Sequence, residues 1–428
     1  MDVLVAIAAI FLTMRTFLLL WLLRRSKSSI HVALTHPKQA LPDVTVLIPC
    51  FNEEKVLAAT VHSVMRSRGV HIQRVVCIDD GSQDRTTNVI HDLERQYGSI
   101  IQCLRQPNAG KAAALNHGLR HVYSVACACI DADTQLLPDT LALLARCFDE
   151  PGVAAVAGHL AVGDSPQAEG VLLHGQQVEY AVANTARRAL SSLTTTLVVP
   201  GAVGLFSAST IRTLGGYSPR TLAEDHDLTM TLVLAGYKVR HAPWAWALTE
   251  VPASPRSLYR QRLRWATGKF QVWIKHRSVL FAGTPRGIGP WLFMLFHELL
   301  APLTCLPLLI GLSLLAFVDA CQAEITLGSG LGAITVLANV IVGYVSHRSA
   351  WHMECEQRAT VGLKVRPSGA WTLMVINLTG FATAWHGLFR ATGKRDAGWC
   401  TSHRRADVCV PAQINTSQHP ADISDTKQ

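Results

Sequence analysis

Short apolar segments alternate with longer helical segments between residues 43 and 157. The predicted strands span residues 44–48, 74–78, 100–104, 125–130 and 153–157, and the predicted helices span 53–68, 84–97, 110–123 and 138–148. Short strands that alternate with helices of this length favour an α/β fold with a mostly parallel, doubly wound sheet. In such a sheet, ligands bind beyond the carboxyl ends of the strands. That edge of the sheet is therefore where functional residues are expected.

Polar motifs follow the first four predicted strands. They are Pro49-Cys50-Phe51-Asn52-Glu53, Asp79-Asp80-Gly81-Ser82, Asn108-Ala109-Gly110-Lys111 and Asp131-Ala132-Asp133. Each motif alone is compatible with an ordinary turn or a helix cap. Parallel strands end at one edge of a sheet, however, so the four motifs are expected to lie together.

Asp131 and Asp133 follow a buried strand and can point to the same side, because alternate residues of a strand share a face. Two such carboxylates repel each other unless a cation lies between them. Mg²⁺ and Mn²⁺ prefer hard oxygen ligands and are commonly held by carboxylates together with substrate phosphates. We therefore predict a metal and nucleotide diphosphate site, with Asp79 and Asp80 contacting the nucleotide and Lys111 balancing phosphate charge. A solvated turn is the alternative.

A second acidic cluster, Ala223-Glu224-Asp225-His226-Asp227, opens a predicted helix over residues 225–235. Acidic residues suit a helix N-terminus because of the helix dipole. A carboxylate near an acceptor hydroxyl is also what a general base requires. Asp225, with Glu224 beside it, is the candidate base, and His226 and Asp227 are predicted to be structural.

Residues 256–277 contain seven Arg and Lys residues, with apolar residues at helical spacing. This pattern predicts a basic amphipathic helix at a membrane surface. Within it, Trp265 is predicted to stack on a sugar ring, and Gln261 and Arg264 to contact sugar or pyrophosphate. The alternative is a solvated basic face.

Three apolar segments are long enough to span a bilayer: residues 3–23, 291–318 and 326–345. Arg24, Arg25 and Lys27 follow the first segment and mark its cytoplasmic end. Pro302 is expected to kink the second segment. Arg15 lies inside the first segment, where a charge is costly, so we expect it to reach toward the interface or to face another helix.

A further apolar segment, residues 371–389, precedes a basic tail. Crossing the membrane there would place that tail outside, against the positive-inside rule, so we predict an interfacial or re-entrant segment. The hydrophobic content of 49% and mean hydropathy of +0.23 also favour a membrane protein. The net charge of +9 favours anionic lipid or a nucleotide as partner, and we expect no nucleic acid.

Taken in order, the motifs resemble those of the processive family 2 glycosyltransferases. The motifs are DDGS at 79–82, NAGKAAALN at 108–116, DAD at 131–133, AED at 223–225 and QRLRW at 261–265. Similar patterns occur in poly-N-acetylglucosamine, nodulation chito-oligosaccharide, hyaluronan and cellulose synthases. The resemblance covers about residues 44–275.

This resemblance implies a GT-A fold and an inverting, Mg²⁺- or Mn²⁺-dependent transfer from a UDP-sugar. By matching position it implies that Asp131 and Asp133 hold the metal and that Asp225 is the base. The nucleotide-sugar contacts it implies are Pro49, Asn52, Glu53, Asp79, Asp80, Lys111 and Asp131. The acceptor contacts it implies are Gln261, Arg264 and Trp265. UDP-N-acetylglucosamine is the expected donor, and a growing glycan is the expected acceptor.

Residues 398–404 resemble the gating loop of hyaluronan and chitin-type synthases, so Trp399 is a further candidate acceptor contact. These relatives usually have TED where this chain has AED at 223–225. The difference removes a threonine but keeps both carboxylates. Three spans make a thin channel wall, so export of a long polymer would require a homo-oligomer or an export partner. Two rivals remain: transfer of one sugar to a lipid or short acceptor, and a catalytically silent scaffold that binds UDP or a second messenger.

These assignments divide the chain into five expected parts. They are an N-terminal transmembrane anchor (1–28), a cytosolic GT-A domain (42–250), a basic interfacial region with QxxRW (251–285), C-terminal transmembrane or interfacial helices (286–390) and a cytosolic tail (391–428). The expected location is the cell membrane, crossed several times, with the catalytic domain in the cytosol.

Overall fold

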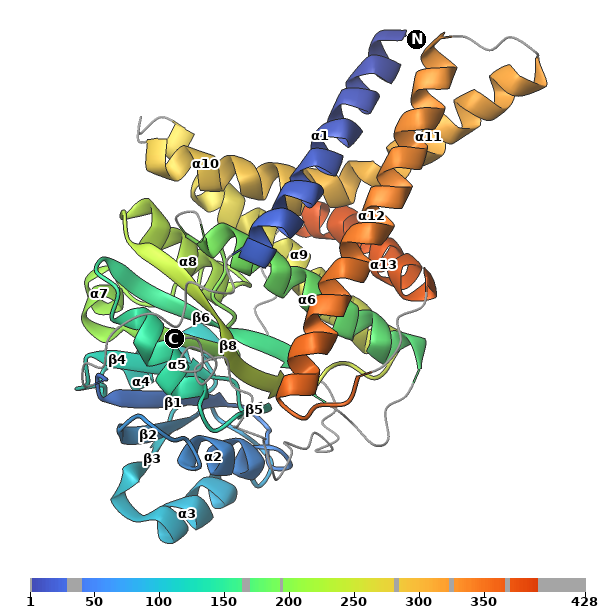
Figure 1. The fold of residues 1–428 in the computed structure, drawn as a ribbon. Helices are drawn as coiled ribbons and strands as arrows, with labels where there is room; N and C mark the ends of the chain where they lie inside the picture. Colours follow the sequence, from blue (N-terminus) through green and yellow to red (C-terminus); the bar gives the residue numbers. More distant parts are fainter. Residues whose placement is uncertain are drawn as a thin grey trace, which may run out of the picture.

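The computed structural model describes residues 2–28, 41–163, 170–192, 195–280, 285–322, 327–365 and 370–391. A sheet covered by helices forms the globular part, and three long helices project from one end of it (Figure 1). Shorter helices lie between these two parts.

One eight-stranded sheet organises the globular part. Its strands are β1 (Val44–Cys50), β2 (Ile72–Asp79), β3 (Ile101–Arg105), β4 (Ala126–Ile130), β5 (Thr134–Leu136), β6 (Val153–Val162), β7 (Val203–Ser207) and β8 (Lys238–Thr249). The strand order is β3-β2-β1-β4-β7-β6-β8-β5. The strands from β1 to β4 pair in parallel, as predicted. The other half of the sheet is mixed, because β7 is antiparallel to β4 and β6, and β5 is antiparallel to β8.

Helices cover both faces of the sheet. The first face carries α2 (Leu57–Met65), α3 (Thr86–Tyr97) and α5 (Thr140–Phe148), and the second carries α4 (Lys111–Leu119), α7 (Ala208–Thr213) and α8 (Glu224–Leu234). Alternate residues of each strand enter opposite cores: Val46 and Ile48 pack on the first face and Leu47 on the second. Burial on both faces explains why these strands are nearly continuous apolar runs.

The remaining helices lie toward the projecting end. They are α1 (Asp2–Ser28), α6 (Val171–Ser191), α9 (Pro255–Lys275), α10 (Pro285–Phe293), a π-helical segment (Met294–Leu300), α11 (Ala301–Cys321), α12 (Leu327–Thr360) and α13 (Ala370–Ala391). Residues 285–321 are helical without interruption, and the π-helical segment within them ends at Leu300, two residues before Pro302, where a kink was predicted.

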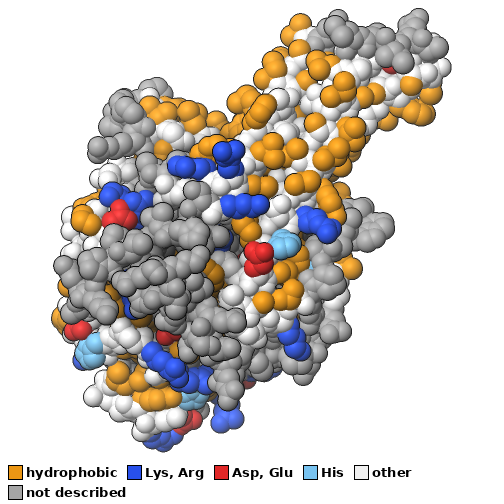
Figure 2. All heavy atoms as spheres, in the orientation of Figure 1, with side chains coloured by type: hydrophobic (Ala, Val, Ile, Leu, Met, Phe, Trp, Pro, Cys, Tyr) orange, Lys and Arg blue, Asp and Glu red, His pale blue; other side chains and the backbone are white. Residues whose placement is uncertain are grey.

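Among the described residues, three helices are long and apolar enough to cross a membrane. They are Val5–Lys27, Ile288–Cys321 and Gly328–Thr360, and they match the three predicted spans. Their projecting surfaces are largely hydrophobic, and Lys and Arg side chains gather near their base (Figure 2). Helix α13 is not one of the three, and it packs against α9, α6 and α11.

Arg15 faces another helix, as expected. Its Nη1 donates a hydrogen bond of 3.1 Å to Asn339 Oδ1 of α12, and Asn339 Nδ2 donates 2.9 Å to the Leu12 carbonyl. Helices α1 and α12 are therefore joined by polar side chains within their apolar surfaces.

Glycines let α9 approach its neighbours closely. A Cβ atom on Gly268 would lie 2.9 Å from the backbone nitrogen of Ala223, and one on Gly387 would lie 2.9 Å from that of Thr267. Helix α9 therefore packs closely on Ala223, which precedes the Glu224-Asp225 pair, on one side. On its other side it packs closely on α13.

We predict that Gly268→Ala lowers the melting temperature in detergent. Overpacking against backbone costs about 1–3 kcal/mol, which exceeds the gain of about 1 kcal/mol in helix propensity. Gly330→Ala is the matched control, because a Cβ there meets nothing within 4 Å. A Gly268→Ala protein that is stabilised as much as the control would contradict this packing.

Candidate active site

A cavity of about 1350 Å³ opens at the carboxyl edge of the parallel strands and extends toward the projecting helices. Most of the predicted site residues line it. They are Pro49, Glu53, Lys111, Asp131, Asp133, Glu224, Asp225, Gln261, Arg264 and Trp265. The structure thus gathers residues from β1, from the segment after β4 and from α4, α8 and α9 around one space.

Asp79 and Asp80 do not line this cavity, and both are fully buried. The Asp79 carboxylate accepts a hydrogen bond of 2.8 Å from the Ser82 nitrogen. The Asp80 carboxylate accepts bonds from the backbone nitrogens of Ala109, at 2.9 Å, and Gly110, at 2.8 Å. In this structure these carboxylates shape the loops at the strand ends, and their nucleotide contact stays a prediction.

Asn52 is not among the residues that line the cavity, although its chain neighbour Glu53 is. It adopts a left-handed backbone conformation, with φ of 55°, and its Oδ1 accepts a bond of 2.9 Å from the Gln83 nitrogen. The two loops after β1 and β2 are joined in this way. Trp399 lies outside the described residues.

Lys111 stands at the centre of the acidic groups. Its Nζ lies 2.5 Å from Asp131 Oδ1 and 3.5 Å from Glu224 Oε1. Burial alone would lower the pKa of Lys111, but Asp131, Glu224 and Asp225 raise it above its ordinary value. The ammonium therefore stays charged and joins the end of β4 to the start of α8.

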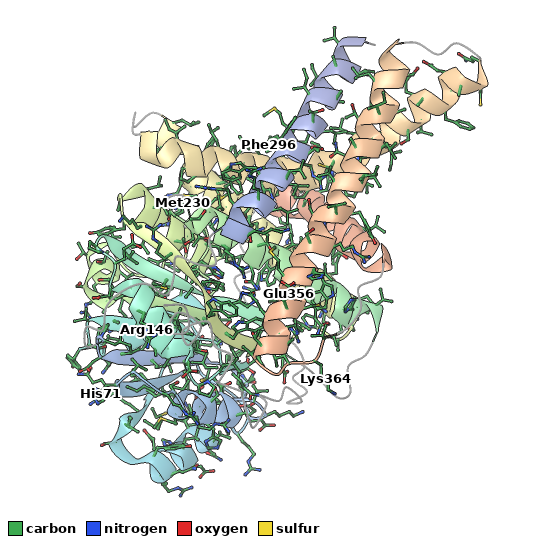
Figure 3. All side chains as sticks on the ribbon, in the orientation of Figure 1. His71, Arg146, Met230, Phe296, Glu356 and Lys364 are labelled. Atoms are coloured by element: carbon green, nitrogen blue, oxygen red, sulfur yellow. The ribbon has the colours of Figure 1, made fainter. Side chains whose placement is uncertain are left out.

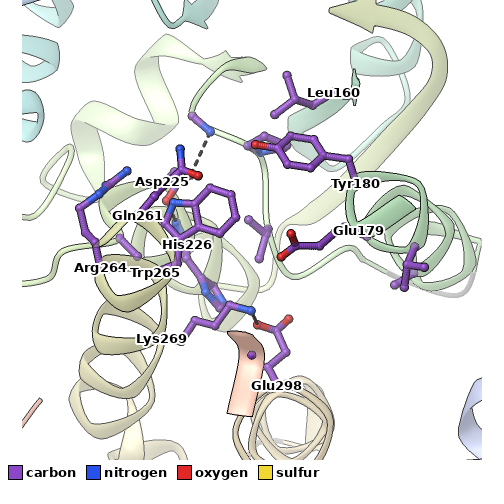
Figure 4. A pocket seen from close by; sticks show the side chains of 18 of the residues that line it. Leu160, Glu179, Tyr180, Asp225, His226, Gln261, Arg264, Trp265, Lys269 and Glu298 are labelled. Carbon is purple, nitrogen blue, oxygen red and sulfur yellow. Dashed lines mark hydrogen bonds and ion pairs between the residues drawn. The ribbon is translucent and has the colours of Figure 1, made fainter. Parts of the chain in front are cut away.

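Asp225 is held by backbone donors. Its Oδ2 accepts a hydrogen bond of 2.9 Å from the Gly201 nitrogen, and its Oδ1 accepts 2.8 Å from the His226 nitrogen (Figure 4). A Cβ on Gly201 would lie 3.3 Å from Asp225 Oδ2 and 2.8 Å from Lys111 Nζ, so a larger residue there would crowd both side chains. The carboxylate that was predicted to be the base thus has a defined orientation at the cavity wall.

Glu224 differs from Asp225 in its surroundings. Burial raises the pKa of Glu224, and the charge of Lys111 opposes this effect. Both residues line the cavity, but Glu224 is buried whereas Asp225 is half-buried. The two adjacent carboxylates are therefore not equivalent, and of the two it is Glu224 that lies within ion-pair distance of Lys111.

Trp265 faces Tyr180 across the cavity (Figure 4), with ring centroids 6.4 Å apart. The Arg262 guanidinium lies 4.0 Å from the Trp265 ring centroid and is buried. Its Nη2 lies 2.6 Å from Glu179 Oε2 on α6. Since Arg262 is buried in an ion pair, this part of α9 is not simply a solvated basic face.

Glu179 and Tyr180 are cavity residues that the sequence analysis missed. They belong to a helix for which no motif was recognised. No local pattern could have revealed them, because their place at the cavity depends on how α6 packs beside α9. Burial also raises the pKa of Tyr180 to about 12, so its hydroxyl stays protonated.

Asp227 fastens α8 to the end of α9. Its carboxylate oxygens lie 2.6 Å from Lys275 Nζ and 2.7 Å from His276 Nε2, and the side chain is 1% exposed. Burial acts to raise the pKa of Asp227, but the contacts with His276 and Lys275 lower it overall. This arrangement agrees with the structural role expected for Asp227.

The sheet, with clustered carboxylates and a lysine at its carboxyl edge, agrees with the GT-A fold that the motifs imply. Residues 45–213 match the family model described as Glycosyl transferase family 2, and this part of the chain belongs to that family.

Two curated relatives illustrate the similarity. The chain is 31% identical over 276 residues to an uncharacterized glycosyltransferase, YaiP, of Escherichia coli (strain K12), covering 64% of this chain and 66% of the relative. It is 28% identical over 237 residues to a poly-beta-1,6-N-acetyl-D-glucosamine synthase of Staphylococcus aureus (strain COL), covering 55% and 56%. The alignments thus span a little over half to just under two thirds of these relatives.

The fold is also similar to that of a solved mannosyltransferase, PcManGT from Pyrobaculum calidifontis, in complex with GDP-Man and Mn²⁺. The TM-score is 0.57 at 19% sequence identity, and the match covers 90% of this chain and 98% of that one. At this identity the similarity establishes the fold.

We predict that Asp227→Asn lowers the stability of the folded protein by about 1.5–3 kcal/mol, because it removes the charge from a buried carboxylate that accepts charge-assisted hydrogen bonds. The melting temperature in detergent measures this effect. Asp92→Asn is the matched control, since Asp92 lies in an exposed pair with Arg95 that should contribute little. Equal melting temperatures for the two variants would show that Asp227 does not fasten α8 to α9.

Proposed function

We propose that the protein is a membrane-bound inverting glycosyltransferase that polymerises sugar from a UDP-sugar into a β-linked glycan. The expected donor is UDP-N-acetylglucosamine. The observation that carries this proposal is the convergence of Asp131, Lys111 and Asp225 on one cavity. The similarity to a poly-N-acetylglucosamine synthase supports the choice of sugar.

In the proposed reaction, Asp225 removes the proton from an acceptor hydroxyl. That oxygen attacks C1 of the donor sugar from the face opposite UDP. The bond between C1 and the UDP oxygen breaks, its electrons leave with UDP, and the configuration at C1 inverts. The Gly201 nitrogen orients Asp225 for this role, and the charged Lys111 stabilises the departing diphosphate.

Asp131 and Asp133 would hold the divalent metal. Both are hard oxygen donors that line the cavity. In the described part of the chain, no group of three potential His, Cys, Asp or Glu ligands occurs. Two carboxylates that leave room for substrate phosphates fit Mg²⁺ or Mn²⁺. A bound ion would supply charge neutralisation for the diphosphate.

The acceptor side of the proposed site consists of Gln261, Arg264 and Trp265, with Trp399 as a further candidate. Trp265 would stack on an acceptor sugar. The Arg262 guanidinium, which lies over the Trp265 ring, would keep the indole in place. Nucleotide contacts are proposed for Pro49, Asn52, Glu53, Asp79 and Asp80.

The proposed topology places the N-terminus of α1 outside and the GT-A domain, residues 42–250, in the cytosol. Helix α9 and the segment of α13 would lie at the membrane interface. Three candidate spans support a multi-pass protein. Export of a long product would then involve a second copy of the chain or an export partner.

We predict that Asp225→Asn reduces transfer by about 10²-fold or more, because the acceptor loses its general base. UDP affinity should stay close to that of the unchanged protein. Release of UDP from donor with acceptor present measures the rate, and UDP binding is measured in parallel. Asp227→Asn provides a comparison that should affect stability more than UDP binding. Turnover by Asp225→Asn at the original rate would remove Asp225 from this role.

Chelation with EDTA should stop transfer, and Mg²⁺ or Mn²⁺ should restore it. Asp133→Asn should raise the concentration of metal needed for half-maximal activity, since it removes one of two anionic ligands. Initial rates across a metal titration measure both effects. Full activity in EDTA would argue against the assignment of Asp131 and Asp133.

A panel of UDP-sugars tests the function itself. Membranes containing the protein are incubated with each radiolabelled sugar, and UDP release and product length are measured. Long products from one sugar support polymerisation, whereas single additions to lipid or a short acceptor support the rival enzyme. UDP binding without release for any sugar would favour a silent scaffold.

A further inference from the structure

The buried Arg262 touches two of the proposed acceptor contacts at once. Its guanidinium carbon lies 4.0 Å from the Trp265 ring centroid, and its Nη1 donates a hydrogen bond to Gln261 Oε1. Residues three or four positions apart are neighbours on a helix surface, so Gln261 and Arg262 both lie beside Trp265 on α9. The orientation of this guanidinium therefore affects the indole and the amide together.

Glu179 of α6 holds the Arg262 guanidinium at two points. Arg262 Nε donates a hydrogen bond of 2.9 Å to Glu179 Oε1, and Nη2 donates one of 2.6 Å to Oε2. A bidentate pair of this kind fixes the geometry of a guanidinium, which a single bond does not. In the described part of the chain, Glu179 is the only carboxylate within ion-pair distance of Arg262. Without it, a buried cation would be left uncompensated.

Helix α6 is itself fixed to the sheet and to a candidate span. Asn184 Nδ2 donates a hydrogen bond of 2.9 Å to the Leu160 carbonyl of β6. Arg188 Nη2 donates one of 2.8 Å to Gln357 Oε1 of α12. All four residues come from different turns or elements, so the axis of α6 is held on two sides. A carboxylate on α6 can therefore set the position of a side chain on α9 relative to the cavity.

We propose that Glu179 is a positioning residue for the acceptor. Through Arg262 it fixes the ring of Trp265 and the amide of Gln261, so that an acceptor sugar meets a surface that is already ordered. Such preorganisation lowers the cost of binding and holds the acceptor hydroxyl in a reactive position relative to Asp225. The acceptor part of this inference rests on the proposed function, whereas the coupling of Glu179 to Trp265 does not.

A second ion pair of the same geometry provides a matched control. Arg240 Nε donates 2.7 Å to Glu150 Oε2, and Nη2 donates 2.6 Å to Oε1. Glu150 lies one turn after Arg146 of α5, which Figure 3 labels on the globular part, and neither member of the pair lines the cavity. Glu150→Gln therefore breaks an equivalent pair that has no contact with the acceptor residues.

Fluorine NMR of the full-length protein in detergent tests the coupling without donor or acceptor. The protein is labelled with fluorotryptophan, and the Trp265 resonance is identified as the one that Trp265→Phe removes. Glu179→Gln should shift this resonance, because only one of the two bonds to Arg262 can remain and the cation moves relative to the ring. Glu150→Gln should leave it unchanged.

Kinetics with UDP-N-acetylglucosamine and chitotetraose test the effect on the acceptor. Glu179→Gln should raise the KM for chitotetraose about tenfold, as expected for the loss of one charge-assisted hydrogen bond, and should change the KM for the donor less than about twofold. Glu150→Gln should change neither constant. A pair that only fastened α6 to α9 would give no such difference between the two substrates.

A double substitution tests whether Glu179 acts through Arg262. In a protein that already carries Arg262→Gln, adding Glu179→Gln should change the KM for chitotetraose less than about twofold, because residues of one network are not additive. A direct contact between Glu179 and the sugar would instead give the full effect in both backgrounds. Melting temperatures identify unfolded variants. Glu179→Asp, which keeps the charge on a shorter side chain, should show smaller changes of the same kind and serves if Glu179→Gln does not fold.

Three results would overturn the proposal. They are an unchanged Trp265 resonance in folded Glu179→Gln, equal changes in the KM values of both substrates, and a full effect of Glu179→Gln in the Arg262→Gln background. A lack of transfer by the unchanged protein would contradict the proposed function instead. In that case the NMR comparison still decides whether Glu179 positions Trp265.

Discussion

The contact between Lys111 and the surrounding carboxylates is the interaction on which the site depends. Asp131 follows β4 and Glu224 opens α8, far apart in the chain, and both lie within ion-pair distance of one half-buried ammonium. Carboxylates brought this close would repel one another without a countercharge. Lys111, the first residue of α4, supplies that charge and so lets the parallel half of the sheet and the later helices meet at one cavity.

Helix α9 connects this cluster to the membrane-proximal helices. Gly268 lets the helix rest on the backbone just before Glu224, and Asp227 binds the end of the same helix. On its other side Arg262 stacks on Trp265 and pairs with Glu179. The wall that would receive an acceptor is thus built jointly by the globular domain and by helices beside the candidate spans. One helix thus connects the cavity wall near Asp225 to the helices beside the candidate spans.

Much of the site could be predicted because its residues follow strands. Short apolar runs identified β1 to β4, and the rule that parallel strands end at one edge brought Lys111, Asp131 and Asp133 together in advance of any coordinates. Asp79 obeys the same rule, yet it turns inward and accepts hydrogen bonds from its own loop. A sequence shows that a carboxylate follows a strand. It does not show whether that carboxylate will accept hydrogen bonds from loop nitrogens or bind a ligand.

The sequence by itself therefore determined the α/β fold, the three apolar spans and the edge of the sheet at which the acidic motifs gather, because periodicity and strand order are local or topological properties. Only the tertiary structure decided that Tyr180 and Glu179 face Trp265, that Arg15 and Arg187 open onto the same cavity, and that β7 inserts antiparallel beside β4. These features depend on which helices pack together, and packing joins residues that share no pattern along the chain.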